Sequence, residues 1–306
     1  MSISTHFVLP ARIVAVLILG VALVAALPVH AAKAQSPATF SIGKITLVSL
    51  VDFPDGAHDV KLFSGASPET INALVPSGQA PSSINAFLVR TGGKNVLIDT
   101  GLGAKSGGVL ARNLASAGLS PSDIDIIILT HLHFDHSGGL SVEGQAVYPK
   151  AVLKISSMEQ KFWLAPDASD PKNNPYINFA SAKAAVAPYA GRLQSFSFGD
   201  EVAPGITAIN AVGHTPGHTA FMIESEGHKV LAWGDTVHAI ALQLPNPEIY
   251  PAYDYDPLAA TAVRKAVLKK VSAENIPVAG AHIPYPGVGR INASPNGQGY
   301  TFTPGR

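Results

Sequence analysis

The sequence contains no cysteine, which limits the chemistry available to the chain. Without cysteine there are no disulfides, no thiolate metal ligands and no lipid-modified cysteine. Any metal site must therefore consist of histidine, aspartate and glutamate. Charged residues are also scarce, at 14%, while hydrophobic residues make up 47%; this balance excludes a disordered chain and predicts a substantial core. No Gly-Lys-Ser/Thr phosphate loop occurs, so a nucleotide loop of that type is excluded.

An excess of charge of either sign is absent as well. The 21 basic and 21 acidic residues balance, so there is no electrostatic footprint for nucleic acid or for an anionic membrane. At the front, Arg12 precedes an apolar run at 13–27, and Ala32-Lys33-Ala34 follows as a small-x-small cleavage site. This pattern predicts a secretory signal peptide over residues 1–34 and a periplasmic or secreted domain over 35–306. Cleavage of this signal peptide would leave a mature chain with two more acidic than basic residues and no stable membrane association. A retained anchor helix is the alternative, although the run is short for a bilayer.

The richest stretch for chemistry is His131-Leu132-His133-Phe134-Asp135-His136, which follows a buried apolar strand at 124–129. Residues two apart on a strand point to the same side, so His131 and His133 can face one point. Asp135 and His136 lie where the chain turns and can reach a second point nearby. Three imidazoles and a carboxylate suit a borderline metal such as zinc.

This His-x-His-x-Asp-His motif resembles the signature of the metallo-β-lactamase superfamily of hydrolases. Later motifs extend the resemblance over about residues 42–290, and Trp-Gly-Asp-x-x-His (233–238) with His-Ile-Pro-Tyr-Pro-Gly (282–287) is most similar to methyl parathion hydrolases and related secreted lactonase-like enzymes. The pattern alone favours a layered α/β or α+β domain. The resemblance implies the four-layer αβ/βα metallo-β-lactamase sandwich, with its site between the two sheets.

The segments expected from periodicity fall in two successive halves. Strands are expected at 40–50, 84–90, 95–100, 124–129, 151–155, 193–198, 207–211, 219–223, 229–233 and 276–280. Helices are expected at 109–119, 158–164, 175–189 and 257–274, the last with Leu258, Val263, Val267 and Val271 turned inward. Residues 51–83 are expected to form a long excursion with at most a short helix at 70–74. That excursion either covers the mouth of a site or is a surface insertion.

The resemblance assigns the remaining ligands. It implies that His131, His133 and His214 hold one metal, that Asp135, His136 and His282 hold the other, and that Asp235 bridges the two. Asp99, in an Asp-Thr-Gly turn, is expected to support a ligand histidine, and His218 to form hydrogen bonds within its loop. The cofactor expected is a pair of divalent ions, most simply zinc, with manganese, cobalt or iron as alternatives.

These ligands leave open metal positions, as a catalytic site requires. The chain is therefore expected to be a dinuclear hydrolase that uses a metal-bridging hydroxide on apolar lactones, esters or phosphotriesters. Asp135 and Asp235 are the expected catalytic carboxylates. His238 either binds substrate or caps a turn. A β-lactamase and a non-enzymatic periplasmic metal-binding protein are the alternatives, and Asp235 argues against the β-lactamase.

Substrate residues are harder to identify. Phe162, Trp163 and Phe179 are the expected pocket wall, where an apolar surface would suit an acyl chain or aromatic leaving group. His58 and His228 are expected to be exposed. A small-molecule substrate is expected, with no nucleic acid, and a homodimer is possible because relatives are often dimers.

Overall fold

The computed structural model describes residues 36–170 and 172–305, which belong to one compact unit, Ala32–Arg306. The expected signal peptide lies outside the described residues. Within the described part of the chain, no helix combines the length and the apolar character needed to span a bilayer.

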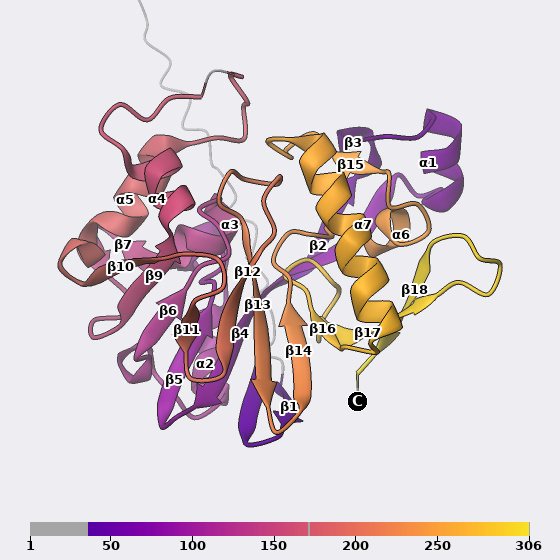
Figure 1. Ribbon diagram of the computed structural model, residues 1–306. Helices are drawn as coiled ribbons and strands as arrows, with labels where there is room; N and C mark the ends of the chain where they lie inside the picture. Colours follow the sequence, from indigo (N-terminus) through magenta and orange to yellow (C-terminus); the bar gives the residue numbers. More distant parts are fainter. Residues whose placement is uncertain (1–35, 171, 306) are drawn as a thin grey trace, which may run out of the picture. The chain divides into compact units, whose positions relative to one another are not determined.

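Two seven-stranded sheets dominate the described residues (Figure 1). In spatial order the first sheet contains β1 (Ala38–Ile42), β2 (Ile45–Asp59), β4 (Gln79–Thr91), β5 (Lys94–Ile98), β6 (Ile126–Ile128), β9 (Val152–Ser156) and β10 (Leu193–Phe196). The second contains β11 (Glu201–Ala203), β12 (Ile206–Asn210), β13 (Thr219–Ser225), β14 (His228–Ala232), β16 (Val278–Ala279), β17 (Val288–Ala293) and β18 (Tyr300–Pro304). Short pairs join β3 (Phe63–Ser64) to β15 (Tyr250–Pro251) and β7 (Ser141–Val142) to β8 (Gln145–Ala146).

Helices cover the outer faces of both sheets. The α-helices are α1 (Pro68–Leu74), α2 (Leu110–Ser116), α3 (Phe134–Ser137), α4 (Ser157–Leu164), α5 (Phe179–Val186), α6 (Ile240–Gln243) and α7 (Pro257–Ala273). Short 3-10 turns are η1 (Val60–Leu62), η2 (Ala104–Ser106), η3 (Pro121–Asp123), η4 (Gly138–Leu140) and η5 (Ala187–Arg192). Helix α4 lies beside β9 and β10, α5 lies against α4, and α7 lies beside β17 (Figure 1).

Side-chain alternation along the strands builds the layers. On β4, Phe87 faces the core between the sheets, whereas Leu88 faces the core under α2, α4 and α5. On β14, Val230 faces the core between the sheets and Leu231 faces α7. Three stacked cores separate four layers, helix–sheet–sheet–helix, and the expected fold class is confirmed.

Several local expectations are wrong. The predicted strand at 40–50 is two strands that turn at Gly43. Residues 51–83 are not an irregular excursion, because β2 continues to Asp59 and pairs with β4, although the short helix is present as α1. Register shifts between Val51 and Gly56 break the alternation that would have marked β2 as a strand. Strands β17 and β18 carry no clear signal and were not expected.

Helix α7 has the expected extent but a different inward face. Leu258 is 81% exposed, whereas Val271 is buried as expected and Val263 and Val267 pack at the edge of the core. The buried stripe includes Arg264, which is fully buried. The helix is rotated so that this charged side chain reaches partners inside the molecule.

Candidate metal centre and adjoining cavity

The predicted metal loop leaves the first sheet after β6. His131 and Leu132 follow in extended chain, His133 precedes the first turn of α3, and Asp135 and His136 lie on α3 itself. Three ring nitrogens meet here: His131 Nε2 lies 3.0 Å from His133 Nδ1, which lies 2.9 Å from His214 Nε2. His131 Nε2 and His214 Nε2 are 3.2 Å apart. The structure thus brings together the three histidines assigned to one metal.

The second group consists of Asp135, His136, Asp235 and His282, whose ligand atoms all lie within 4.8 Å of one another. His282 Nε2 is 3.4 Å from Asp135 Oδ2, and His136 Nε2 is 3.1 Å from Asp235 Oδ1. Loops from both sheets supply these residues, since α3 follows β6 in the first sheet and His282 follows β16 in the second.

Asp235 lies between the two groups. Its Oδ2 atom is 3.2 Å from His214 Nε2 and 3.2 Å from His282 Nε2, so one carboxylate faces both. The preceding Gly234 has φ +54°, and a Cβ there would lie 2.5 Å from His218 Nε2. Only glycine allows this approach, which places Asp235 at the centre.

The donor set fits divalent metal ions. A tetrahedral zinc with metal–nitrogen distances of about 2.0–2.1 Å keeps its ligand nitrogens roughly 3.3 Å apart, close to the spacing of the three histidine nitrogens. Buried His136 Nε2 and Asp235 Oδ1 lie 3.1 Å apart, yet neither has a partner with hydrogen-bond geometry among the described residues. Buried polar atoms are normally paired, so these atoms point to a cation between them.

Four candidate ligand histidines use their other ring nitrogen to contact a neighbour. The contacts are His131 Nδ1 to Thr130 Oγ1 at 3.0 Å, His136 Nδ1 to Asp99 Oδ2 at 2.8 Å, His214 Nδ1 to Asp254 Oδ1 at 2.9 Å and His282 Nδ1 to the Ser83 carbonyl at 3.1 Å. Such partners fix the tautomer and direct Nε2 inward.

Asp99 and His218 occupy the supporting positions expected from the sequence. Asp99 has φ +60°, a conformation that costs a non-glycine residue energy. It is held by hydrogen bonds from Thr130 to both carboxylate oxygens. His218 donates from Nδ1 to the Ala211 carbonyl at 2.8 Å and accepts the Asp235 amide at Nε2 at 3.0 Å. It therefore positions Asp235 with both nitrogens already in use.

Burial and carboxylates divide the histidines into two electrostatic sets. Burial lowers the pKa of His133 and of His218 to about 3. Burial also opposes charge on His214 and His282, but Asp235 and Asp254 raise the pKa of His214 to about 9. Asp235 and Asp135 raise the pKa of His282 to about 10. Protons therefore balance the carboxylates in the metal-free protein.

A cavity of about 330 Å³ opens beside these groups. It is lined by His58, Leu62, His133, Phe134, Asp135, Tyr176, His214, Asp235, His238, Tyr253 and His282. Its wall is largely aromatic, and its volume is near the lower end of ligand sites. The cavity therefore fits a compact, fairly apolar molecule with its reactive bond at the carboxylates.

The expected pocket wall is wrong for this cavity, which Phe162, Trp163 and Phe179 do not line. Trp163 is 1% exposed, and its ring packs edge-on to His133 with centroids 5.5 Å apart. Phe162 and Phe179 pack against Trp163. Trp163 of α4 is therefore buried against His133 and supports it, whereas Phe162 of α4 and Phe179 at the start of α5 are half-buried around Trp163.

His58 and His238 belong to the cavity. His58 is not exposed as expected: it lies on the extended part of β2 and its ring is 5.3 Å from that of His282. His228 is exposed as expected. His238 is buried, and its Nε2 atom lies 3.0 Å from Asp235 Oδ2.

Sequence reasoning also missed three buried residues behind the ligands. Asp254 Oδ2 is 3.3 Å from Arg264, whose guanidinium also donates to the Thr236 carbonyl at 2.9 Å. Glu159 accepts the amides of Leu132 at 3.1 Å and Gly217 at 2.8 Å, so it ties both histidine loops together. Arg264 was detectable, because it falls on the same helical stripe as Ala260 and Leu268; Asp254 and Glu159 have no comparable signal.

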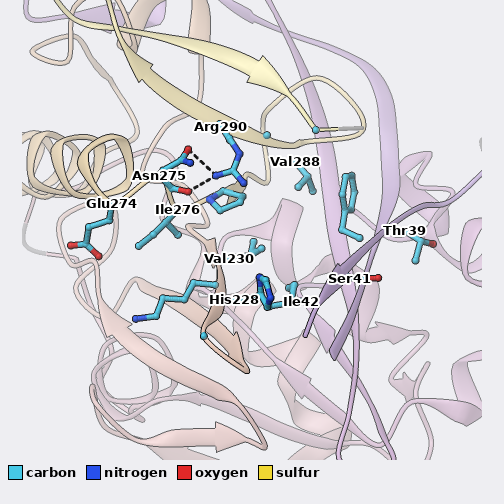
Figure 2. Close-up of a pocket in the computed structure, with 16 residues that line it drawn as sticks. Thr39, Ser41, Ile42, His228, Val230, Glu274, Asn275, Ile276, Val288 and Arg290 are labelled. Atoms are coloured by element: carbon cyan, nitrogen blue, oxygen red, sulfur yellow. Dashed lines mark hydrogen bonds between the residues drawn. The ribbon is translucent and has the colours of Figure 1, made fainter. Parts of the chain in front are cut away.

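A second, larger cavity of about 650 Å³ lies away from these groups, between β1, β14, β17 and the end of α7 (Figure 2). Arg290 projects toward Asn275 there and donates hydrogen bonds to its carbonyl and side-chain oxygens (Figure 2). None of the candidate metal ligands lines this cavity, which therefore carries no part of the chemistry above.

Two clusters of histidines that share an aspartate, at the loop end of a four-layer sandwich, define a class of metal-dependent hydrolase. The chain matches the family model described as the metallo-beta-lactamase superfamily over residues 80–282 and belongs to that family. The resemblance stated from the sequence is thereby confirmed at the level of the superfamily.

Solved structures with the same fold cover nearly the whole chain. The crystal structure of AbOPH, a hydrolase in the β-lactamase superfamily, has 30% sequence identity and a TM-score of 0.82, and the alignment covers 90% of this chain and 99% of that one. AidC, a dizinc quorum-quenching lactonase, has 24% identity and a TM-score of 0.79 over 89% of this chain and 98% of its own. The similarity to AidC concerns the fold.

Curated relatives have diverse names. A ribonuclease of Thermus thermophilus is 28% identical over 59% of this chain and 42% of its own length. An N-acyl homoserine lactonase from Bacillus is 30% identical over 37% of this chain and 38% of its own. The chain spans about half the length of the curated relatives it matches.

Proposed function

We propose that this protein is a dinuclear metal-dependent hydrolase of compact, apolar lactones and aryl esters, with phosphotriesters as further substrates. The observation that carries the proposal is the Asp235 carboxylate between two histidine groups, next to a cavity of about 330 Å³. A relative named N-acyl homoserine lactonase supports the lactone class. A small neutral substrate also suits the balanced charge of the chain.

His131, His133 and His214 would hold one ion and Asp135, His136 and His282 the other, with Asp235 shared. Divalent ions bound there, most simply zinc, would supply an acidified water and polarise the scissile carbonyl or phosphoryl oxygen. The chain's own residues then transfer protons and orient the reacting groups.

Asp135 is the residue placed to move a proton. Its side chain is 30% exposed toward the cavity, whereas Asp235 is 3% exposed. Although burial opposes the charge, His136 and His282 hold the pKa of Asp135 below its usual value. With ions bound, these histidines would carry no proton and the ions would supply the positive charge instead, so the carboxylate would again be ionised. It would then accept a proton from the attacking water and pass it to the leaving oxygen.

His238 is placed to accept a hydrogen bond. Its Nε2 atom faces Asp235 Oδ2 at 3.0 Å and must carry the hydrogen, which leaves a lone pair on Nδ1. Buried Nδ1 has no partner among the described residues. His238 therefore has an acceptor at Nδ1 and no free N–H with which to polarise a carbonyl oxygen.

The test measures metal content and turnover together on a panel of an acyl-homoserine lactone, a δ-lactone, p-nitrophenyl acetate, methyl parathion and nitrocefin. About two metals per chain, with turnover of a lactone or ester lost on chelation, is the expected result. Turnover of nitrocefin alone would instead support a β-lactamase, and two metals without turnover would support a metal-binding protein.

The shared carboxylate gives a sharper version of this test. Asp235→Asn should lose at least one metal and reduce kcat by more than about 10²-fold, because a neutral amide cannot serve two cations. The exposed turn residue Asp200 provides the matched control, since Asp200→Asn changes the same groups outside the site. Unchanged hydrolysis by Asp235→Asn would refute the assignment.

A further inference from the structure

His58 and Tyr253 form a hydrogen-bonded pair on the wall of the cavity beside the candidate metal centre. Tyr253 Oη lies 3.0 Å from His58 Nδ1. The His58 ring contacts that of His282 at 5.3 Å, and the Tyr253 ring contacts that of His238 at 4.9 Å, between centroids. The pair therefore borders the reacting region.

The direction of the hydrogen bond determines which His58 nitrogen carries hydrogen. The Tyr253 phenol keeps its proton at neutral pH, so its hydroxyl can donate to its hydrogen-bond partner, His58 Nδ1. When the hydroxyl donates to Nδ1, the hydrogen of the imidazole must be on Nε2. Buried His58 Nε2 has no hydrogen-bond partner in the described part of the chain. In that tautomer His58, which lines the cavity, holds one N–H donor without a partner among the residues described.

The pair is also held rigidly. His58 is paired with Ala80 in the β2–β4 ladder, so its backbone belongs to the sheet. Tyr253 precedes Asp254, which is fixed by His214 and Arg264. Groups on rigid elements lose little freedom when they bind a ligand. The unpaired nitrogen of His238, Nδ1, carries a lone pair, whereas His58 Nε2 carries the hydrogen in the tautomer described above.

We propose that His58 Nε2–H, oriented by Tyr253, donates a hydrogen bond to the substrate oxygen that gains negative charge during hydrolysis. This inference rests on the proposed hydrolase function. A preoriented donor stabilises such charge far more in a dry site than in water. His58 is then a catalytic residue, and Tyr253 is a positioning residue that acts through it.

The kinetic test compares His58→Gln, His58→Leu and Tyr253→Phe with the wild type, using p-nitrophenyl acetate and phenyl acetate. Glutamine keeps an N–H donor near the position of Nε2, so its kcat should stay within a few-fold. Leucine removes the donor, and kcat should fall about 10²-fold with little change in KM. A larger loss on phenyl acetate, the poorer leaving group, would place the donor at the leaving oxygen; an equal loss would place it at the carbonyl oxygen.

Two further readouts separate catalysis from structural support. Metal content should be unchanged in all three variants, and loss of metal in His58→Leu would overturn the proposal. Nitrogen NMR of the wild type should show His58 with hydrogen on Nε2, and Tyr253→Phe should redistribute it toward Nδ1. Equal kcat for the glutamine and leucine variants would also overturn the proposal. Failure of the wild type on every substrate would instead refute the proposed function.

Discussion

Single residues matter at this site because each candidate ligand histidine must present one particular ring nitrogen. His214 illustrates the point. Its Nδ1 atom contacts Asp254, and Asp254 in turn contacts Arg264, so two further buried residues fix one imidazole. Breaking a buried charge pair leaves the surviving charge without compensation. The effect of a change at Asp254 should therefore reach the metal.

Asp254→Asn should weaken metal binding about 10- to 100-fold, because the amide orients His214 less strongly and leaves Arg264 unpaired. Competition with a coloured chelator measures the affinity, and circular dichroism verifies that the variant is folded. Asp256→Asn is the matched control two residues away: Asp256 caps α7 by accepting the Ala259 amide, and asparagine caps equally well. Equal affinities in the two variants would show that Asp254 does not orient the ligand.

At this scale the sequence identified the seven residues of the two candidate metal groups described above, but not the residues behind them. Histidines at motif spacing carry their own signal, whereas Asp254 and Glu159 become informative only after folding. His58 was misjudged because its strand contains register shifts. Trp163 was assigned to the pocket because an aromatic residue near a site in sequence gives no indication of which side it faces.

Helix α4 shows how an element can organise a site without supplying ligands. Its Glu159 is buried and accepts hydrogen bonds from Leu132 in the first histidine loop, and from Thr215 and Gly217 in the second. The first loop belongs to the first sheet and the second loop to the second sheet. Sequence patterning predicted the helix within one residue, but the face bearing Glu159 is set by packing against the loops.

Glu159→Gln should lower the free energy of unfolding by about 1–3 kcal/mol, because the amide NH₂ would face a backbone donor and leave it unsatisfied. Denaturant titration of the metal-free protein measures the change without interference from bound ions. Glu143→Gln serves as the control, since its exposed ion pair with Lys105 should contribute no more than about 1 kcal/mol. A similar loss of unfolding free energy in both variants would show that Glu159 does not hold the two histidine loops together.

At the scale of the whole molecule, the fold is predictable where apolar and polar residues alternate along the strands. It is less predictable where strand pairing depends on distant contacts. Four layers follow from alternating apolar residues on strands such as β4 and β14. Strand β18 is an edge strand of the second sheet and β17 lies next to it, and their pairing depends on tertiary contacts that periodicity does not encode. The site forms where loops from both sheets meet, so its integrity is coupled to the packing of the sandwich.

That coupling predicts how metal removal changes stability with pH. In the metal-free protein Asp235 and neighbouring carboxylates raise the pKa of His214 to about 9 and of His282 to about 10. A raised pKa in the folded state stabilises below the unfolded value of about 6.5, and this contribution is lost as pH rises toward 9–10. Metal binding requires unprotonated histidines, so the same increase in pH favours it. The gap in Tm between metal-loaded and chelated protein should therefore widen from pH 6.5 to 8.5, measured by calorimetry in matched buffers. A difference in Tm that stays constant or narrows would mean that the ions do not displace protons from His214 and His282.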